Sequence, residues 1–301
     1  MQLPGAARVM QGTLFQYAQG RQAVLSGELG AKCVVLLGGL SDGLLACPYA
    51  PALADALAEA GWATCQPVLR TSYLQFGFGS LDSDVEDLDA LLTGTLANVD
   101  DVCLVGHSTG SQVAAHYVRR GARAVRACVL QAGCSDRETD DDAERASRDP
   151  WLSAARDLVA KGDGEEFLPR AAHWAPMTAR RYLDLHEKGG TDDYFSSDLS
   201  DGTMAEIYAS WGERETGCLV AYSGADEYAP KSVDKGALVR RICGFAAAGN
   251  GGRVAGVVIP NANHNLSEDA NAAPALVAAV VAFLAGGRVE GAVFDSSSSG
   301  G

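Results

Sequence analysis

The feature that most restricts the fold is a glycine-flanked serine, which lies between an apolar run typical of a strand and a segment with helical spacing. Residues 104–111 read LVGHSTGS; an apolar run precedes them and apolar residues at helical spacing follow. A tight turn from a strand into a helix leaves no room for side chains beside the serine, and Gly106 and Gly110 meet that demand. Strain in such a turn would raise the Ser108 hydroxyl out of the sheet, where a base and a substrate can reach it. The sequence therefore predicts a reactive serine at a strand-to-helix turn.

Apolar runs and helical patterns alternate along most of the chain, which is typical of a parallel sheet with crossover helices. Near-continuous apolar strands further indicate a sheet covered on both faces. Together with the Gly-x-Ser-x-Gly turn, this predicts an α/β class protein of the α/β-hydrolase fold: a mostly parallel central sheet, helices on both faces and a helical cap insertion. The predicted strands cover residues 33–37, 63–68, 102–105, 127–131, 218–222 and 255–259, and the predicted helices cover 49–60, 81–97, 111–120, 231–247 and 269–284.

One long stretch interrupts this alternation and predicts the cap. Residues 135–216 carry charge clusters, helical pieces over 151–161 and 177–187, and a segment rich in Ser and Asp. The stretch falls between two predicted strands of the sheet, so we expect a cap over the active site. We expect a single domain over residues 1–294 that includes this insertion. The Ser- and Gly-rich end, residues 295–301, predicts a flexible tail.

A serine nucleophile needs a base that removes its proton and an acid that orients the base. In α/β-hydrolases these follow in the chain order Ser, acid, His, each in a loop after a strand. His264 follows the last predicted strand and precedes the last helix, which is the expected place of the base. Of the other histidines, His107 in the turn is expected to pack, and His116 in the next helix to lie in the core or on the surface. His173 and His186 are expected to pack within the cap, with contact to substrate as the alternative.

Three acidic residues qualify as the partner of the histidine. Asp226 follows the penultimate predicted strand after a turn of small residues, and is the first choice. Its neighbour Glu227 is the second choice, because adjacent side chains point in different directions. Asp136, after the strand that ends at residue 131, is a third option because some α/β-hydrolases place their acid there.

The oxyanion hole requires two backbone N–H groups directed at the developing negative oxygen. One is expected from Thr109, the residue after the nucleophile. The other is expected from the loop after the first predicted strand, where residues 38–43 read GGLSDG and Leu40 is the candidate donor. Glycines in this loop would let its backbone approach the substrate closely.

Composition excludes several other classes of protein. The net charge of −14 disfavours nucleic acid and anionic membranes as partners. No apolar stretch approaches the length of a membrane span, and residues 1–11 lack the apolar core of a secretory signal. The eight cysteines form no Cys-x-x-Cys pair, so we expect no metal site and a reducing, cytoplasmic location. Gly77-Phe78-Gly79 lacks the third glycine of a dinucleotide fingerprint, so no cofactor is expected.

Four motifs in order carry a resemblance to a known family: GGLSDGL at 38–44, GHSTG at 106–110, FSSDLSD at 195–201 and ADEYAP at 225–230. Together they resemble a plant and fungal family of α/β-hydrolases, long catalogued as a domain of unknown function, whose members include fungal siderophore esterases. The resemblance spans roughly residues 14–284. It implies the α/β-hydrolase fold and an esterase, which in some members acts on ester bonds of hydroxamate siderophores such as fusarinines. Ser108, Asp226 and His264 match the expected triad positions, whereas Ala229 departs from the valine usual in relatives.

The sequence thus predicts a cofactor-free serine hydrolase of a small-molecule carboxylic ester, with no metal. The alternative is a non-catalytic or slow-turnover protein of the same fold that binds a small molecule. A complete Ser-Asp-His set favours the enzyme. The acyl and alcohol groups of the substrate and the oligomeric state do not follow from the sequence.

Overall fold

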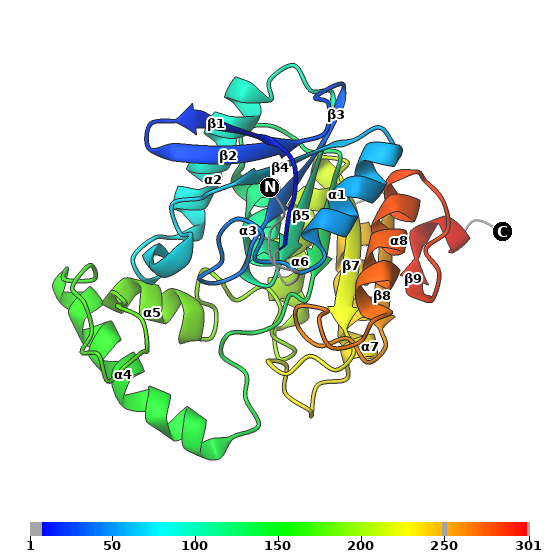
Figure 1. Ribbon diagram of the computed structural model, residues 1–301. Coiled ribbons are helices and arrows are strands. Elements are labelled where there is room, and N and C mark those ends of the chain that lie inside the picture. Colours follow the sequence, from blue (N-terminus) through cyan, green and yellow to red (C-terminus); the bar gives the residue numbers. More distant parts are fainter. Residues whose placement is uncertain (1–7, 249–251, 300–301) are drawn as a thin grey trace.

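A nine-stranded, mostly parallel sheet forms the centre of the molecule in this computed structural model, which describes residues 8–248 and 252–299 (Figure 1). The strand order is β1-β2-β4-β3-β5-β6-β7-β8-β9. Neighbouring strands from β4 to β8 pair in parallel, whereas β1-β2, β2-β4 and β8-β9 are antiparallel. The parallel strands are β3 (Lys32–Leu37), β4 (Ala63–Pro67), β5 (Asp101–His107), β6 (Ala127–Gln131), β7 (Gly217–Ser223) and β8 (Val254–Ile259). All six predicted strands are therefore present, and the α/β-hydrolase fold class is confirmed.

The edge strands β1 (Thr13–Ala18), β2 (Arg21–Ser26) and β9 (Ala292–Asp295) were not predicted, because they are largely half-buried or exposed and mix polar with apolar residues. The segment expected as a flexible tail also differs over its described part. Asp295 ends β9 and forms an ion pair with Arg253, and the Ser296 hydroxyl accepts a hydrogen bond from Val254 N–H. A 3-10 turn, η3 (Ser296–Ser299), follows, and residues 300–301 lie outside the described part.

Helices cover both faces of the sheet, as predicted. One face packs against α1 (Ala50–Glu59) and α8 (Ala272–Leu284). The other packs against α2 (Leu81–Ala90), α3 (Thr109–Arg120), α6 (Asp201–Glu213) and α7 (Lys235–Ala248). Successive strand residues enter opposite cores: in β5, Leu104 lies in the core under α3, whereas Cys103 and Val105 lie in the core under α1 and α8. Burial on both faces explains why these strands read as continuous apolar runs.

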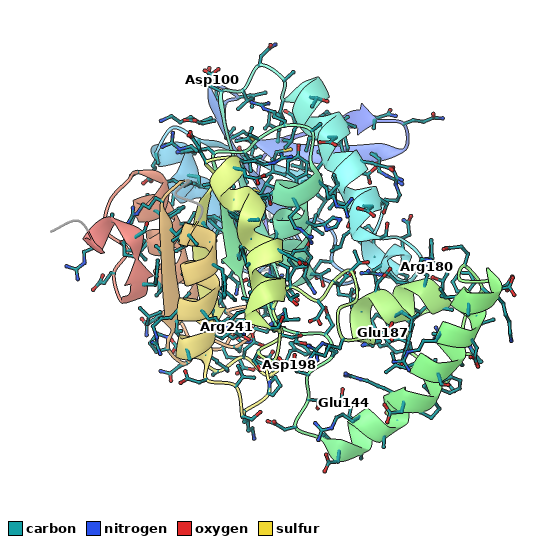
Figure 2. All side chains as sticks on the ribbon, turned by 180° about the vertical axis from the view of Figure 1, so that it is seen from behind. Asp100, Glu144, Arg180, Glu187, Asp198 and Arg241 are labelled. Atoms are coloured by element: carbon teal, nitrogen blue, oxygen red, sulfur yellow. The ribbon has the colours of Figure 1, made fainter. Side chains whose placement is uncertain are left out.

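The region predicted as a cap consists of two parts. Helices α4 (Asp142–Lys161) and α5 (Ala179–His186) stand out from the sheet and share a small core of their own with the turn η1 (Tyr73–Gly77) (Figure 1). Figure 2 shows them from behind, with Glu144 near the start of α4 and Arg180 on α5. The third helix of the stretch, α6, buries its apolar side in the main core instead. The projecting cap is thus the α4–α5 hairpin.

A buried ion pair fastens the cap to the body. Arg181 of α5 binds both carboxylate oxygens of Asp192, at 2.6 and 2.9 Å, and the two side chains are only 2% and 1% exposed. The guanidinium also donates to the Phe76 carbonyl of η1 at 2.8 Å. The Asp192 carbonyl in turn accepts a hydrogen bond from Gln112 of α3. These contacts connect α5 to the helix that begins just after Ser108.

All eight cysteines are buried and free. Burial raises the pKa of several of these thiols, including Cys33 and Cys47, to about 12, so they behave as small apolar core residues. No helix within residues 8–248 and 252–299 is long and apolar enough to cross a membrane.

Candidate active site

The serine turn between β5 and α3 has the strained geometry that its sequence predicts. Ser108 has φ 53° and ψ −125°, a positive-φ conformation that non-glycine residues rarely adopt. A Cβ on Gly106 would lie 2.2 Å from the Gly110 carbonyl oxygen, and one on Gly110 would lie 2.5 Å from the Leu37 carbonyl oxygen. The backbone is held by a hydrogen bond from Ser108 N–H to the Gln131 carbonyl, at 3.0 Å. Both glycines are therefore required by close packing of the backbone.

His264 and Asp226 are in direct contact at the carboxyl edge of the sheet. The Nδ1 atom of His264 lies 2.9 Å from each carboxylate oxygen of Asp226. The Asp226 side chain is fully buried, and Tyr228 N–H also donates to it at 3.0 Å. The Tyr228 ring packs edge-on against the His264 ring, at 4.7 Å between centroids. The histidine ring is therefore held in one orientation by a carboxylate and an aromatic neighbour.

The other two acidic residues considered from the sequence make different contacts. Glu227 accepts a hydrogen bond from the main-chain N–H of His264 at 2.8 Å, so it holds the backbone rather than the ring. Asp136 accepts from the side-chain amide of Gln112 at 2.5 Å, and burial raises its pKa to about 6. The structure thus places Asp226, of these three, at the imidazole.

Ser108 and His264 both face one open cavity of about 830 Å³. Among the described residues, no hydrogen bond joins the serine hydroxyl to the imidazole; such contacts are often long in the absence of substrate. Seven of the lining residues are acidic and two are basic. The acidic ones are Asp42, Asp136, Glu138, Asp140, Asp141, Glu144 and Glu227, and the basic ones are Arg148 and Lys231.

The loop after β3 lies against the serine, as the predicted oxyanion hole requires. A Cβ on Gly39 would meet the Ser108 Cβ at 2.8 Å, so the backbone passes directly beside the nucleophile. The loop is closed on itself, because Gly39 N–H donates to the Asp42 carboxylate at 2.7 Å and Asp42 N–H donates to the Gly39 carbonyl at 3.1 Å. Leu40 lines the cavity, and Thr109 is the first residue of α3.

The remaining histidines have structural partners. His116 is buried between Tyr194 and Asp82, each 2.7 Å from a ring nitrogen. In the cap, the His186 ring contacts the Asp136 carbonyl, and burial lowers the pKa of His186 to about 3. Neither His186 nor His173 is among the described residues that line the cavity. Packing roles for these residues agree with the expectation from the sequence.

His107 is closer to the site than the sequence indicates. Its ring lines the cavity and packs against the His264 ring, at 5.0 Å between centroids. Burial lowers the pKa of His107 to about 4, with a further contribution from His264, so the ring is neutral at pH 7. Its Nδ1 lies 2.6 Å from the side-chain oxygen of Gln131. Gln131 was not identified from the sequence as a residue of the site. The signal available in the sequence was a polar residue at the end of an apolar strand.

Within residues 8–248 and 252–299, two groups of side chains have potential metal ligands within 4.8 Å of one another: Asp42, Cys47 and His107, and Cys134, Asp226 and His264. In the first group, His107 is hydrogen-bonded to Gln131, and Asp42 is hydrogen-bonded to Gly39. In the second group, Asp226 and His264 bind each other. Neither set is assigned to a metal.

The sheet order, the strained serine between β5 and α3, and the inserted cap define this chain as an α/β-hydrolase-fold protein. A family model described as "Protein of unknown function (DUF1749)" matches residues 1–285. The chain therefore belongs to this family, and the resemblance stated from its motifs is confirmed.

Relatives and solved structures support the same placement. The chain is 32% identical to the fusarinine C esterase sidJ of Aspergillus fumigatus, over 80% of this chain and 84% of that protein. It is 30% identical to the UPF0613 protein PB24D3.06c of Schizosaccharomyces pombe, over 84% of this chain and 86% of that protein. The siderophore hydrolase EstB from Aspergillus fumigatus superposes with a TM-score of 0.77 at 27% identity, over 94% of this chain and 99% of that one.

Proposed function

We propose that this chain is a cofactor-free serine esterase. Ser108 Oγ attacks the ester carbonyl while His264 takes the hydroxyl proton, and the N–H groups of Leu40 and Thr109 stabilise the oxyanion. Collapse of the tetrahedral intermediate breaks the ester C–O bond, and His264 returns the proton to the leaving alcohol. Water, activated by the same histidine, then hydrolyses the acyl-enzyme. Asp226 orients the imidazole and stabilises its charged form.

The observation that carries this proposal is the Asp226–His264 contact at the cavity that contains Ser108. A carboxylate bonded to Nδ1 leaves Nε2 as the proton acceptor, which is the tautomer that a general base requires. The strained conformation of Ser108 is a second support, because such strain is concentrated at functional sites.

We propose that the substrate resembles those of the siderophore esterases. Two relatives named above are a fusarinine C esterase and a siderophore hydrolase. A cavity of about 830 Å³ with a predominantly acidic lining suits a large polar ester better than a fatty acyl ester. We further propose one hydrolase domain over residues 1–294 and a cytoplasmic location, which the eight free buried cysteines support.

Covalent labelling by a fluorophosphonate, with parallel hydrolysis of a p-nitrophenyl ester series, tests the mechanism. We expect the wild type to be labelled once and Ser108→Ala to be neither labelled nor active, with an unchanged melting temperature. Ser153→Ala, at an exposed serine of α4, is the matched control and should behave as the wild type. A folded wild type that resists labelling and cleaves no ester would favour a binding protein of the same fold.

A further inference from the structure

Gln131 connects the loops that carry the proposed nucleophile and base. It is the last residue of β6 and is fully buried although polar. Its main-chain carbonyl accepts the Ser108 N–H, at 3.0 Å, and the Ser111 hydroxyl, at 3.0 Å. Its side-chain Nε2 donates to the His264 carbonyl, at 3.1 Å, and to the Ser223 hydroxyl at the end of β7, at 3.3 Å. One residue thus contacts the main chain of both Ser108 and His264.

The other end of the Gln131 amide binds the neighbour of the nucleophile. Oε1 accepts from the Tyr49 hydroxyl at 3.1 Å and lies 2.6 Å from Nδ1 of His107. The His264 carbonyl can only accept a hydrogen bond, so the NH2 group must face it and Oε1 must face His107. His107 therefore carries its proton on Nδ1. Both amide donors and both lone pairs of Oε1 are used, which leaves this side chain a single orientation.

From this network we propose that Gln131 is a positioning residue, which fixes the His264 loop relative to the serine turn. The proposal rests on the proposed function. Asp226 and Glu227 both belong to the loop after β7, so their bonds hold His264 relative to that loop. Gln131 belongs to β6, which pairs directly with β5, the strand that leads into Ser108. Its side chain is therefore a hydrogen-bonded link from the sheet beneath the serine turn to the histidine loop.

Two substitutions separate this role from simple packing. Gln131→Met keeps most of the side-chain volume and removes all four side-chain hydrogen bonds. Gln131→Glu keeps the shape but turns a carboxylate oxygen toward the His264 carbonyl, where two acceptors repel. Gln66→Met is the matched control, because Gln66 is a sheet glutamine, 5% exposed, that accepts one hydrogen bond from Leu45 N–H at 3.1 Å.

We expect kcat to fall about 100-fold in both Gln131 variants, since a misplacement of about 1 Å can have that effect. KM should stay near the wild-type value, because the substrate-contacting groups remain. Fluorophosphonate labelling should slow by the same factor. Gln66→Met should lower the melting temperature but leave kcat unchanged. If Gln131→Met and Gln131→Glu keep the wild-type kcat per folded molecule while only their melting temperatures fall, Gln131 is structural and the proposal is wrong.

NMR of histidine labelled with nitrogen-15 provides a readout that does not depend on turnover. We expect the signal of the His264 ring N–H, bonded to Asp226, to shift in both Gln131 variants and to stay in place in Gln66→Met. A wild type that neither labels nor cleaves esters would refute the proposed function, and the NMR comparison alone would then decide the role of Gln131. Unchanged His264 signals in both Gln131 variants would overturn the positioning role proposed for Gln131.

Discussion

Gly106→Ala is expected to disable the site through the backbone, without removing any functional group. The added Cβ would lie 2.2 Å from the Gly110 carbonyl oxygen, 2.3 Å from its carbonyl carbon and 2.5 Å from Ser111 N. Ordinary contacts begin at 3.4 Å, so the chain on one side of the turn must move by about 1 Å. All three atoms belong to the backbone, and a change of rotamer offers no relief.

Because Gly106 and Gly110 lie on either side of Ser108, this movement displaces the serine itself. A displacement of about 1 Å corresponds to a loss of about 100-fold in kcat, or about 2.7 kcal/mol in the activation free energy. Steady-state hydrolysis of a p-nitrophenyl ester, together with the rate of fluorophosphonate labelling, measures this loss.

Gly244→Ala is the matched control, because, apart from its chain neighbours and the backbone of its own helix, no atom of the described residues lies within 4 Å of its would-be Cβ, and the residue is exposed in α7. It should leave kcat unchanged and raise stability by up to about 1 kcal/mol, as expected for alanine in a helix. A Gly106→Ala protein with kcat within about twofold of the wild type would contradict the argument that close backbone packing positions Ser108.

Three further predictions concern charged side chains. Asp226→Asn should lower kcat by about 10⁴-fold, because the amide favours the wrong histidine tautomer, whereas Glu227→Gln should have a much smaller effect; ester hydrolysis compares them. Asp192→Asn should reduce the free energy of unfolding by about 3–5 kcal/mol in urea, because Arg181 is left buried without its counter-charge, and a loss under 1 kcal/mol would refute this. Burial raises the pKa of Asp84 from 3.8 to about 7, so between these values the folded state keeps a proton that the unfolded state has lost, and stability falls as pH rises. The free energy of unfolding in urea, measured at either end of this pH range, should change less in Asp84→Asn than in the wild type. An equal change in both proteins would contradict the raised pKa of Asp84.

The central strands could be predicted from the sequence because they are buried on both faces of the sheet. β6 was predicted with the bounds that the structure shows, and the other five central strands within two residues. The edge strands β1, β2 and β9 were missed, since each has residues open to solvent and no clean apolar pattern. The insertion was recognised as a break in the alternation, but its division was not, because no helix was predicted over residues 201–213, where α6 packs on α3 and α7.

The arrangement of the candidate site could be predicted from the order of its residues along the chain, whereas the residues that hold them in position could not. Ser108, Asp226 and His264 each follow a parallel strand, and such strand ends meet at one edge of the sheet. Gln131 could not be recognised in this way, because its side-chain partners are 24 to 133 residues distant along the chain. Likewise, Asp226 and Glu227 are adjacent and chemically alike, and only the folded loop directs one to the ring and the other to the backbone.

The burial of all eight cysteines makes this protein suitable for site-specific spectroscopy. Thiol reagents need an exposed thiolate, and all eight native thiols are buried. Cys134 lines the cavity, but burial raises its pKa well above the usual value, which keeps this thiol protonated. A cysteine introduced at the exposed position Ser153 of α4 would therefore be the reactive one, with no need to remove native cysteines. A dye or spin label at this position would report whether the α4–α5 hairpin moves when an ester enters the cavity.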